Sequence, residues 1–148
     1  LKSEKHLEAD TDDLIIYRID KKSRDYDSIY CLDISNENFF GFKIMKYEKN
    51  KKVYIIGSPA DYNTIDYEEG RIRTEQYIIS CKYIGEGIEN KTYEIETSSE
   101  FNKDGMSGSP VYCVYQMNGD LLINFVGVYI RENYYLDGQV LMDMLSKI

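Results

Sequence analysis

Short apolar runs alternate with polar turns along most of the chain, and this pattern predicts antiparallel β-strands. Residues 92–96 alternate polar and apolar side chains with a period of two, as a strand with one buried face does. The pair Asn118-Gly119 favours a two-residue hairpin turn, because both residues tolerate positive φ. Strands are expected at residues 14–19, 28–34, 40–45, 51–57, 75–84, 91–97, 111–117 and 121–130.

The last segment has a different periodicity. Asp137-Gly138 opens it, and its apolar residues then recur with the spacing of one helix face. These residues are Val140, Leu141, Met144, Leu145 and Ile148. A single C-terminal helix is therefore expected after a series of strands.

Composition limits the classes of function. The chain has 148 residues, 43% of them apolar, which is enough material for one core. A net charge of -8 argues against nucleic acid or an anionic membrane surface as the main partner, because phosphate binding needs clustered Lys and Arg. No apolar run approaches the length of a membrane span. Three cysteines in apolar runs favour a reducing compartment, so a cytoplasmic location is expected.

The stretch Asp-Gly-Met-Ser-Gly-Ser-Pro-Val at residues 104–111 is the strongest chemical signal. Glycines on both sides of Ser107 predict a tight turn that presents one hydroxyl with open space around it. The amides of Gly105 and Ser107 can converge beside that hydroxyl, which is what acyl transfer requires at the developing oxyanion. A polar loop that leads into a strand is the simpler interpretation of the same residues.

This stretch, the hairpin at residues 118–120 and the strand Phe-Val-Gly-Val-Tyr at residues 125–129 resemble the nucleophile region of the chymotrypsin-like (trypsin-like) serine peptidases. The bacterial glutamyl-endopeptidase branch is the most similar, with Gly-Asn-Ser-Gly-Ser-Pro-Val at its nucleophile. The resemblance implies an all-β fold, a chymotrypsin-like double β-barrel with a C-terminal helix. Residues 1–50 would be a remnant of the first barrel, and residues 51–148 the complete second barrel and the helix.

The same resemblance implies a serine endopeptidase that acts through an acyl-enzyme on Ser107. Gly105 and Ser107 would form the oxyanion hole. Asp13 precedes the apolar run at residues 14–19, as the family's triad Asp precedes a strand. An acidic loop that caps a strand is the alternative for Asp13, and Asp12 is the neighbour that competes for the same role.

The catalytic histidine is the missing part. The chain has one His, His6, which lies seven residues before Asp13, whereas the family places its base much earlier. A surface or packing role is the better interpretation of His6. Because only about three strands are expected before residue 51, the chain looks like part of a longer protein, and a missing N-terminal segment or an associated chain would carry the His. Alone, the chain is expected to be inactive.

By resemblance, the pocket for the substrate side chain is walled by Phe101 and by residues 128–132, which include Val128, Tyr129 and Arg131. Phe101 at its base disfavours a Lys or Arg side chain, because burying an unpaired cation is costly. Arg131 would supply a positive charge, so a neutral or acidic side chain is expected.

The rival hypothesis is a catalytically inactive trypsin-like fold that binds peptides or proteins through the same cleft. Both hypotheses name a protein or peptide as the partner. No zinc-ligand spacing, phosphate-binding loop or dinucleotide fingerprint occurs in the sequence, so neither a metal nor a cofactor is expected.

Overall fold

The structure is a computed structural model, and it describes residues 48–97 and 102–147. Its elements, in chain order, are β1 (Lys52–Gly57), a short 3-10 helix η3 (Ala60–Tyr62), β2 (Thr64–Asp66), β3 (Arg71–Arg73), β4 (Tyr77–Glu86), β5 (Thr92–Thr97), β6 (Pro110–Met117), β7 (Asp120–Arg131), β8 (Tyr134–Asp137) and the helix α2 (Gly138–Leu145).

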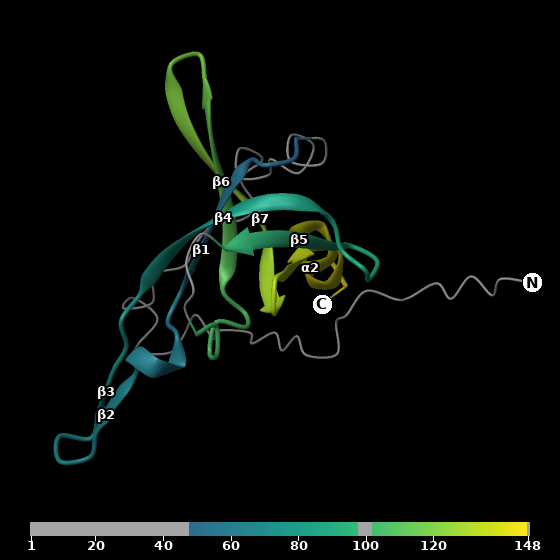
Figure 1. Ribbon diagram of the computed structural model, residues 1–148. Coiled ribbons are helices and arrows are strands. Elements are labelled where there is room, and N and C mark those ends of the chain that lie inside the picture. The colour runs from purple at the N-terminus through teal and green to yellow at the C-terminus, as the bar shows by residue number, and fades with distance from the viewer. Residues whose placement is uncertain (1–47, 98–101, 148) are drawn as a thin grey trace, which may run out of the picture.

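Six of the strands close into an antiparallel barrel in the order β1-β4-β5-β8-β7-β6 (Figure 1). Pairing between β1 and β6 closes it, with Val53 opposite Cys113 and Tyr54 opposite Tyr112. Closure matters because an open sheet would leave unpaired backbone groups at its edges. The expected β-barrel followed by a C-terminal helix is thus confirmed for residues 52–145.

Two hairpins extend from the barrel in Figure 1. One is formed by the outer parts of β6 and β7, and its turn is the expected Asn118-Gly119 pair, in which both residues have positive φ. The other is the separate two-stranded sheet of β2 and β3. The barrel core is therefore built by the inner parts of the strands.

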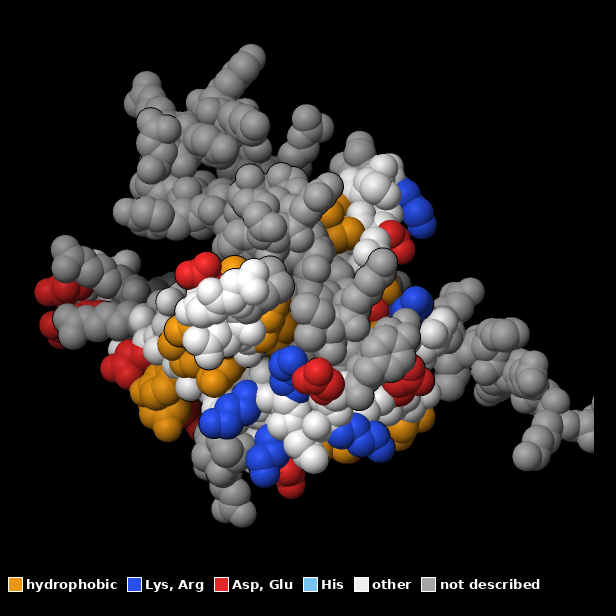
Figure 2. All heavy atoms as spheres, turned by 90° about the horizontal axis from the view of Figure 1, so that it is seen from above, with side chains coloured by type: hydrophobic (Ala, Val, Ile, Leu, Met, Phe, Trp, Pro, Cys, Tyr) orange, Lys and Arg blue, Asp and Glu red, His pale blue; other side chains and the backbone are white. Residues whose placement is uncertain are grey.

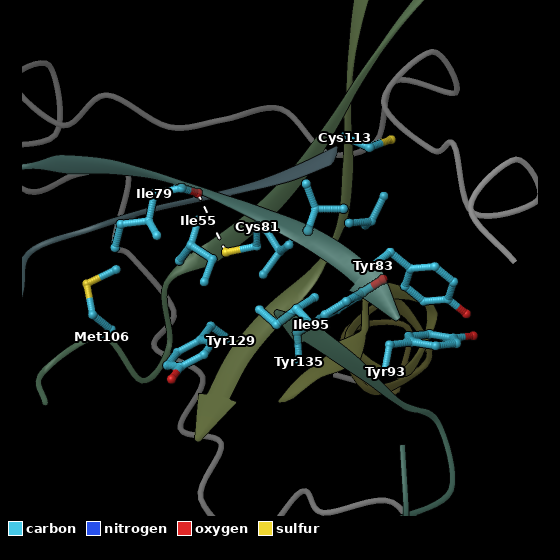
Figure 3. Close-up of a cluster of buried hydrophobic side chains, with 13 residues drawn as sticks. Ile55, Ile79, Cys81, Tyr83, Tyr93, Ile95, Met106, Cys113, Tyr129 and Tyr135 are labelled. Carbon is cyan, nitrogen blue, oxygen red and sulfur yellow. Dashed lines mark hydrogen bonds between the residues drawn. The ribbon is translucent and has the colours of Figure 1, made fainter. Parts of the chain in front are cut away.

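Alternation along the strands fills the core. Val53 and Ile55 of β1 are buried and the residue between them is partly exposed, and β4 repeats this alternation at Ile79, Cys81 and Tyr83. Tyrosine provides much of the volume in a chain with no Trp. The ring centroids of Tyr83 and Tyr93 lie 5.9 Å apart, and those of Tyr93 and Tyr135 5.3 Å apart (Figure 3).

The start of α2 is fixed by Asp137. One carboxylate oxygen accepts a hydrogen bond from the amide of Gln139 at 2.9 Å, which is an N-cap contact, and the other accepts from the hydroxyl of Tyr93 at 3.0 Å. One acidic side chain therefore joins the end of β8, the helix and the buried face of β5.

Several expectations lie outside the described residues: the strands at residues 14–19, 28–34 and 40–45, the roles of Asp13 and His6, and the pocket residue Phe101. Within the described part, the sequence pattern did not predict β8. This strand has four residues and is separated from β7 by two, so it has no room for a visible alternation.

Candidate functional site

The Ser107 loop, residues 103–109, is a series of tight turns that leads into β6. Gly105 and Gly108 have φ of +82° and +88°, so both adopt the left-handed backbone that the sequence predicts. At Gly105 the space is also restricted, because a Cβ would lie 2.8 Å from the amide nitrogen of Ala60. That amide donates to the carbonyl of Asp104 at 2.7 Å. Only glycine fits this approach.

A buried side chain anchors the loop to the barrel core. Met106 has no exposed surface and belongs to the barrel core, where Figure 3 shows it at the same end as Tyr129. Gly57, at the end of β1, makes room for it, since a Cβ there would lie 2.8 Å from the Met106 Cε atom. The loop position is therefore coupled to the packing of the core.

Strand β7 holds the other side of the loop. The amide of Gly108 donates to the carbonyl of Tyr129 at 2.8 Å, and the amide of Tyr129 donates to the carbonyl of Ser109 at the same distance. The hydroxyl of Ser107 donates to the carbonyl of Ile130 at 2.7 Å. Ser107 is exposed, so its hydroxyl rests on the strand while it stays open to solvent.

Two backbone N–H groups of the loop have no acceptor among the described residues. No described residue accepts a hydrogen bond from the amides of Gly105 and Ser107, and both residues are exposed. A solvated amide costs nothing in the free protein and is available to a ligand oxygen. The arrangement can thus offer one hydroxyl and two N–H donors to a carbonyl group.

Lys103 ties the loop to the β7–β8 turn. Its ammonium donates to the carbonyl of Glu132 at 3.0 Å and also to the side chain of Asn133. Immediately before the loop, the Asn102 side chain donates to Asp61 of η3 at 2.9 Å. The loop is therefore held between η3 and the end of β7.

The predicted pocket residues lie in different environments. Tyr129 is 2% exposed, and its hydroxyl donates to the carbonyl of Glu132 at 2.6 Å. Burial raises the pKa of Tyr129 to about 12. Val128 is also buried, whereas the Arg131 side chain is half exposed. The structure therefore brings Ser107 close to β7 through backbone contacts, and it leaves Arg131 as the accessible side chain of the three.

Arg131 lines a pocket of about 260 Å³. Its guanidinium forms an ion pair at 2.6 Å with Glu89, which lies in the turn between β4 and β5. Sequence reasoning missed Glu89, because it stands in a polar turn with no periodicity or motif around it. The pocket is lined by Ile88, Glu89, Thr92, Ile130, Arg131, Glu132 and Tyr134.

Comparison with known proteins gave no match to a protein-family model, to a curated protein or to a solved structure.

Other features of the described residues concern charge and metals. Figure 2 shows Lys, Arg, Asp and Glu side chains interspersed on the face seen from above, so the described part of that face carries mixed charge. Among residues 48–97 and 102–147, no three His, Cys, Asp or Glu side chains gather as metal ligands would. The described part contains no helix with the length and apolar character to cross a membrane.

Proposed function

We propose that this chain provides the nucleophile of a serine endopeptidase, and that Ser107 attacks the peptide carbonyl. The observation that carries the proposal is an exposed serine hydroxyl in the same tight turn as two amides that no described residue engages, in a loop fixed by core packing and by β7. As the bond from Oγ to carbon forms, negative charge moves to the carbonyl oxygen, where the amides of Gly105 and Ser107 stabilise it.

The reaction needs a base for the Ser107 proton. No His occurs among residues 48–97 and 102–147, so the imidazole comes from elsewhere, from a further segment or an associated chain, and Asp13 orients it. The imidazole takes the hydroxyl proton and then gives it to the leaving amine as the C–N bond breaks. Water later releases the acyl group. Before attack, the Ser107 hydroxyl must turn from the Ile130 carbonyl toward the base.

The fold assignment belongs to the same proposal. We take the barrel of residues 52–137 and the helix α2 as the second barrel of a chymotrypsin-like double barrel, with residues 1–50 as part of the first. The closed six-stranded barrel with one helix after it supports this assignment, since it is what the resemblance implies.

A peptide- or protein-binding module without catalysis is the second candidate. The hydrogen bond from Ser107 to the Ile130 carbonyl favours it, because this hydroxyl has a stable partner that is not a base. In that case the same amides would bind a peptide carbonyl without a covalent step.

A fluorophosphonate probe on residues 1–148 separates the two candidates. The probe should label Ser107 when imidazole is added as an external base, and Ser107→Ala should remove the label. Ser146→Ala is the matched control, because Ser146 is also exposed and its hydroxyl also donates to a backbone carbonyl, that of Asp143 at 2.9 Å. This control should be labelled as the wild type is.

Equal labelling of all three proteins would eliminate the nucleophile assignment and leave the binding module. Labelling of the wild type at one rate with and without imidazole would mean that a residue of this chain, such as His6, already serves as the base. Circular dichroism of Ser107→Ala checks that the barrel is retained.

A further inference from the structure

The pocket beside Arg131 and the Ser107 hydroxyl both involve one residue of β7. Ile130 connects the two places, since its carbonyl accepts the Ser107 hydrogen bond and the residue also lines the pocket. Apolar surface comes from Ile88, Ile130 and Tyr134, and charge comes from Glu89, Arg131 and Glu132. A ligand side chain that enters the pocket must therefore have an apolar part that packs against the first group and a polar end that meets the second.

Glu89 has an unsatisfied oxygen at this pocket. Its Oε1 atom accepts from Arg131 at 2.6 Å, while Oε2 is buried and has no hydrogen-bond partner. Among the described residues, it is the one buried side-chain nitrogen or oxygen in this condition. A buried acceptor without a donor destabilises the free protein, so a ligand N–H group at that point gains more than it would in water.

The charges of the pocket select among ligands. A carboxylate would meet Glu89 and Glu132, and it would have to compete with Glu89 for Arg131. A cation would be attracted by the same two carboxylates, but it would also lie against the guanidinium of Arg131, which repels it. A neutral carboxamide suits both groups, because its N–H donates to Glu89 Oε2 and its oxygen accepts from the guanidinium, which has several donors. The ion pair thus presents an acceptor and a donor together.

We propose that this pocket is the subsite for a glutamine side chain of the bound peptide. The two methylene groups of glutamine lie against Ile88, Ile130 and Tyr134, and its carboxamide reaches the Glu89–Arg131 pair. This inference rests on the proposed role of Ser107 and its loop in binding a peptide. It narrows the sequence-based expectation of a neutral or acidic side chain to a neutral amide.

The test uses Ser107→Ala in the 148-residue chain, so that binding is measured without turnover. Peptides selected from a random display library should share glutamine at one position. By fluorescence anisotropy, replacing that glutamine with glutamate or lysine should weaken binding roughly tenfold, as the loss of a hydrogen bond to a charged group does.

Two isosteric variants in the same background change the preference in opposite directions. Glu89→Gln removes one negative charge from beside Arg131 and should shift the selected residue toward glutamate. Arg131→Gln leaves the Glu89 charge and should shift it to lysine. Glu86→Gln, an exposed glutamate of β4 that does not line the pocket, is the control and should keep glutamine.

Selected peptides with no preference at any position, or with a preference that neither variant shifts, would overturn the subsite proposal. If the fluorophosphonate probe labels Ser107 but the peptides give either of these results, the subsite proposal fails while the peptidase proposal stands. If the probe fails and both variants shift the preference as expected, the subsite stands on a binding module.

Discussion

The Ser107 loop and the tip of the β6–β7 hairpin both turn the chain through left-handed backbone, yet different forces hold them. Gly105 has φ of +82° and Gly119 has φ of +95°. A Cβ on Gly105 would strike the backbone at Ala60, whereas nothing lies within 4 Å of one on Gly119. The hairpin turn needs only its own two residues, while the Ser107 loop needs the barrel, so the conformation of the loop is a product of tertiary packing.

The largest difference in stability between the two regions is expected when the apolar side chain near each turn is replaced by alanine. Met106→Ala should lower the free energy of unfolding by about 2–5 kcal/mol, because it leaves a cavity in the core. Leu121→Ala, at a side chain that is 73% exposed, should change it by less than about 0.5 kcal/mol. Urea denaturation of both variants measures the two values. Similar losses would contradict the anchoring role of Met106.

The glycines give a smaller contrast. Gly105→Ala and Gly119→Ala should both lose about 1–2 kcal/mol of stability from left-handed backbone. Gly105→Ala should lose about 1–3 kcal/mol more, because its Cβ meets the backbone of Ala60. Thermal unfolding of the pair provides the comparison. If the two variants have the same melting temperature, the loop accommodates the added methyl group and is less rigid than its contacts indicate.

The smallest effect concerns pH. Tyr129 has a pKa of about 12 in the folded chain, raised first by burial, while an unfolded tyrosine titrates near 10. The folded state holds the proton more tightly, so this stabilisation is complete below about pH 10 and is lost as the pH rises toward about 12. Tyr129→Phe should show a shallower loss of stability across that window.

At neutral pH, Tyr129→Phe should cost about 1 kcal/mol, because the hydrogen bond to the Glu132 carbonyl is removed. Tyr67→Phe, at a ring that is 87% exposed, controls for loss of a hydroxyl and should be as stable as the wild type. An unchanged alkaline profile in Tyr129→Phe would mean that other buried tyrosines dominate the pH dependence.

Local signals explain what the sequence could predict. Alternation gave β5, the Asn118-Gly119 turn gave the β6–β7 hairpin, and Asp137-Gly138 gave the start of α2, since each depends on neighbouring residues alone. The glycines around Ser107 predicted its exposed turn for the same reason. The role of Glu89 could not be predicted from local signals, because Glu89 and Arg131 are 42 residues apart in the sequence. Their ion pair depends on how the β4–β5 turn lies against β7.

Two thiols flank the strand that closes the barrel. Cys81 of β4 and Cys113 of β6 both stand opposite Val53 of β1, one on each side, and both are buried. Burial raises the pKa of each to about 11, so little reactive thiolate forms at neutral pH. Because both thiols are buried, a reagent reaches them only when this part of the barrel opens. Their rate of modification therefore reports how often the barrel opens around β1.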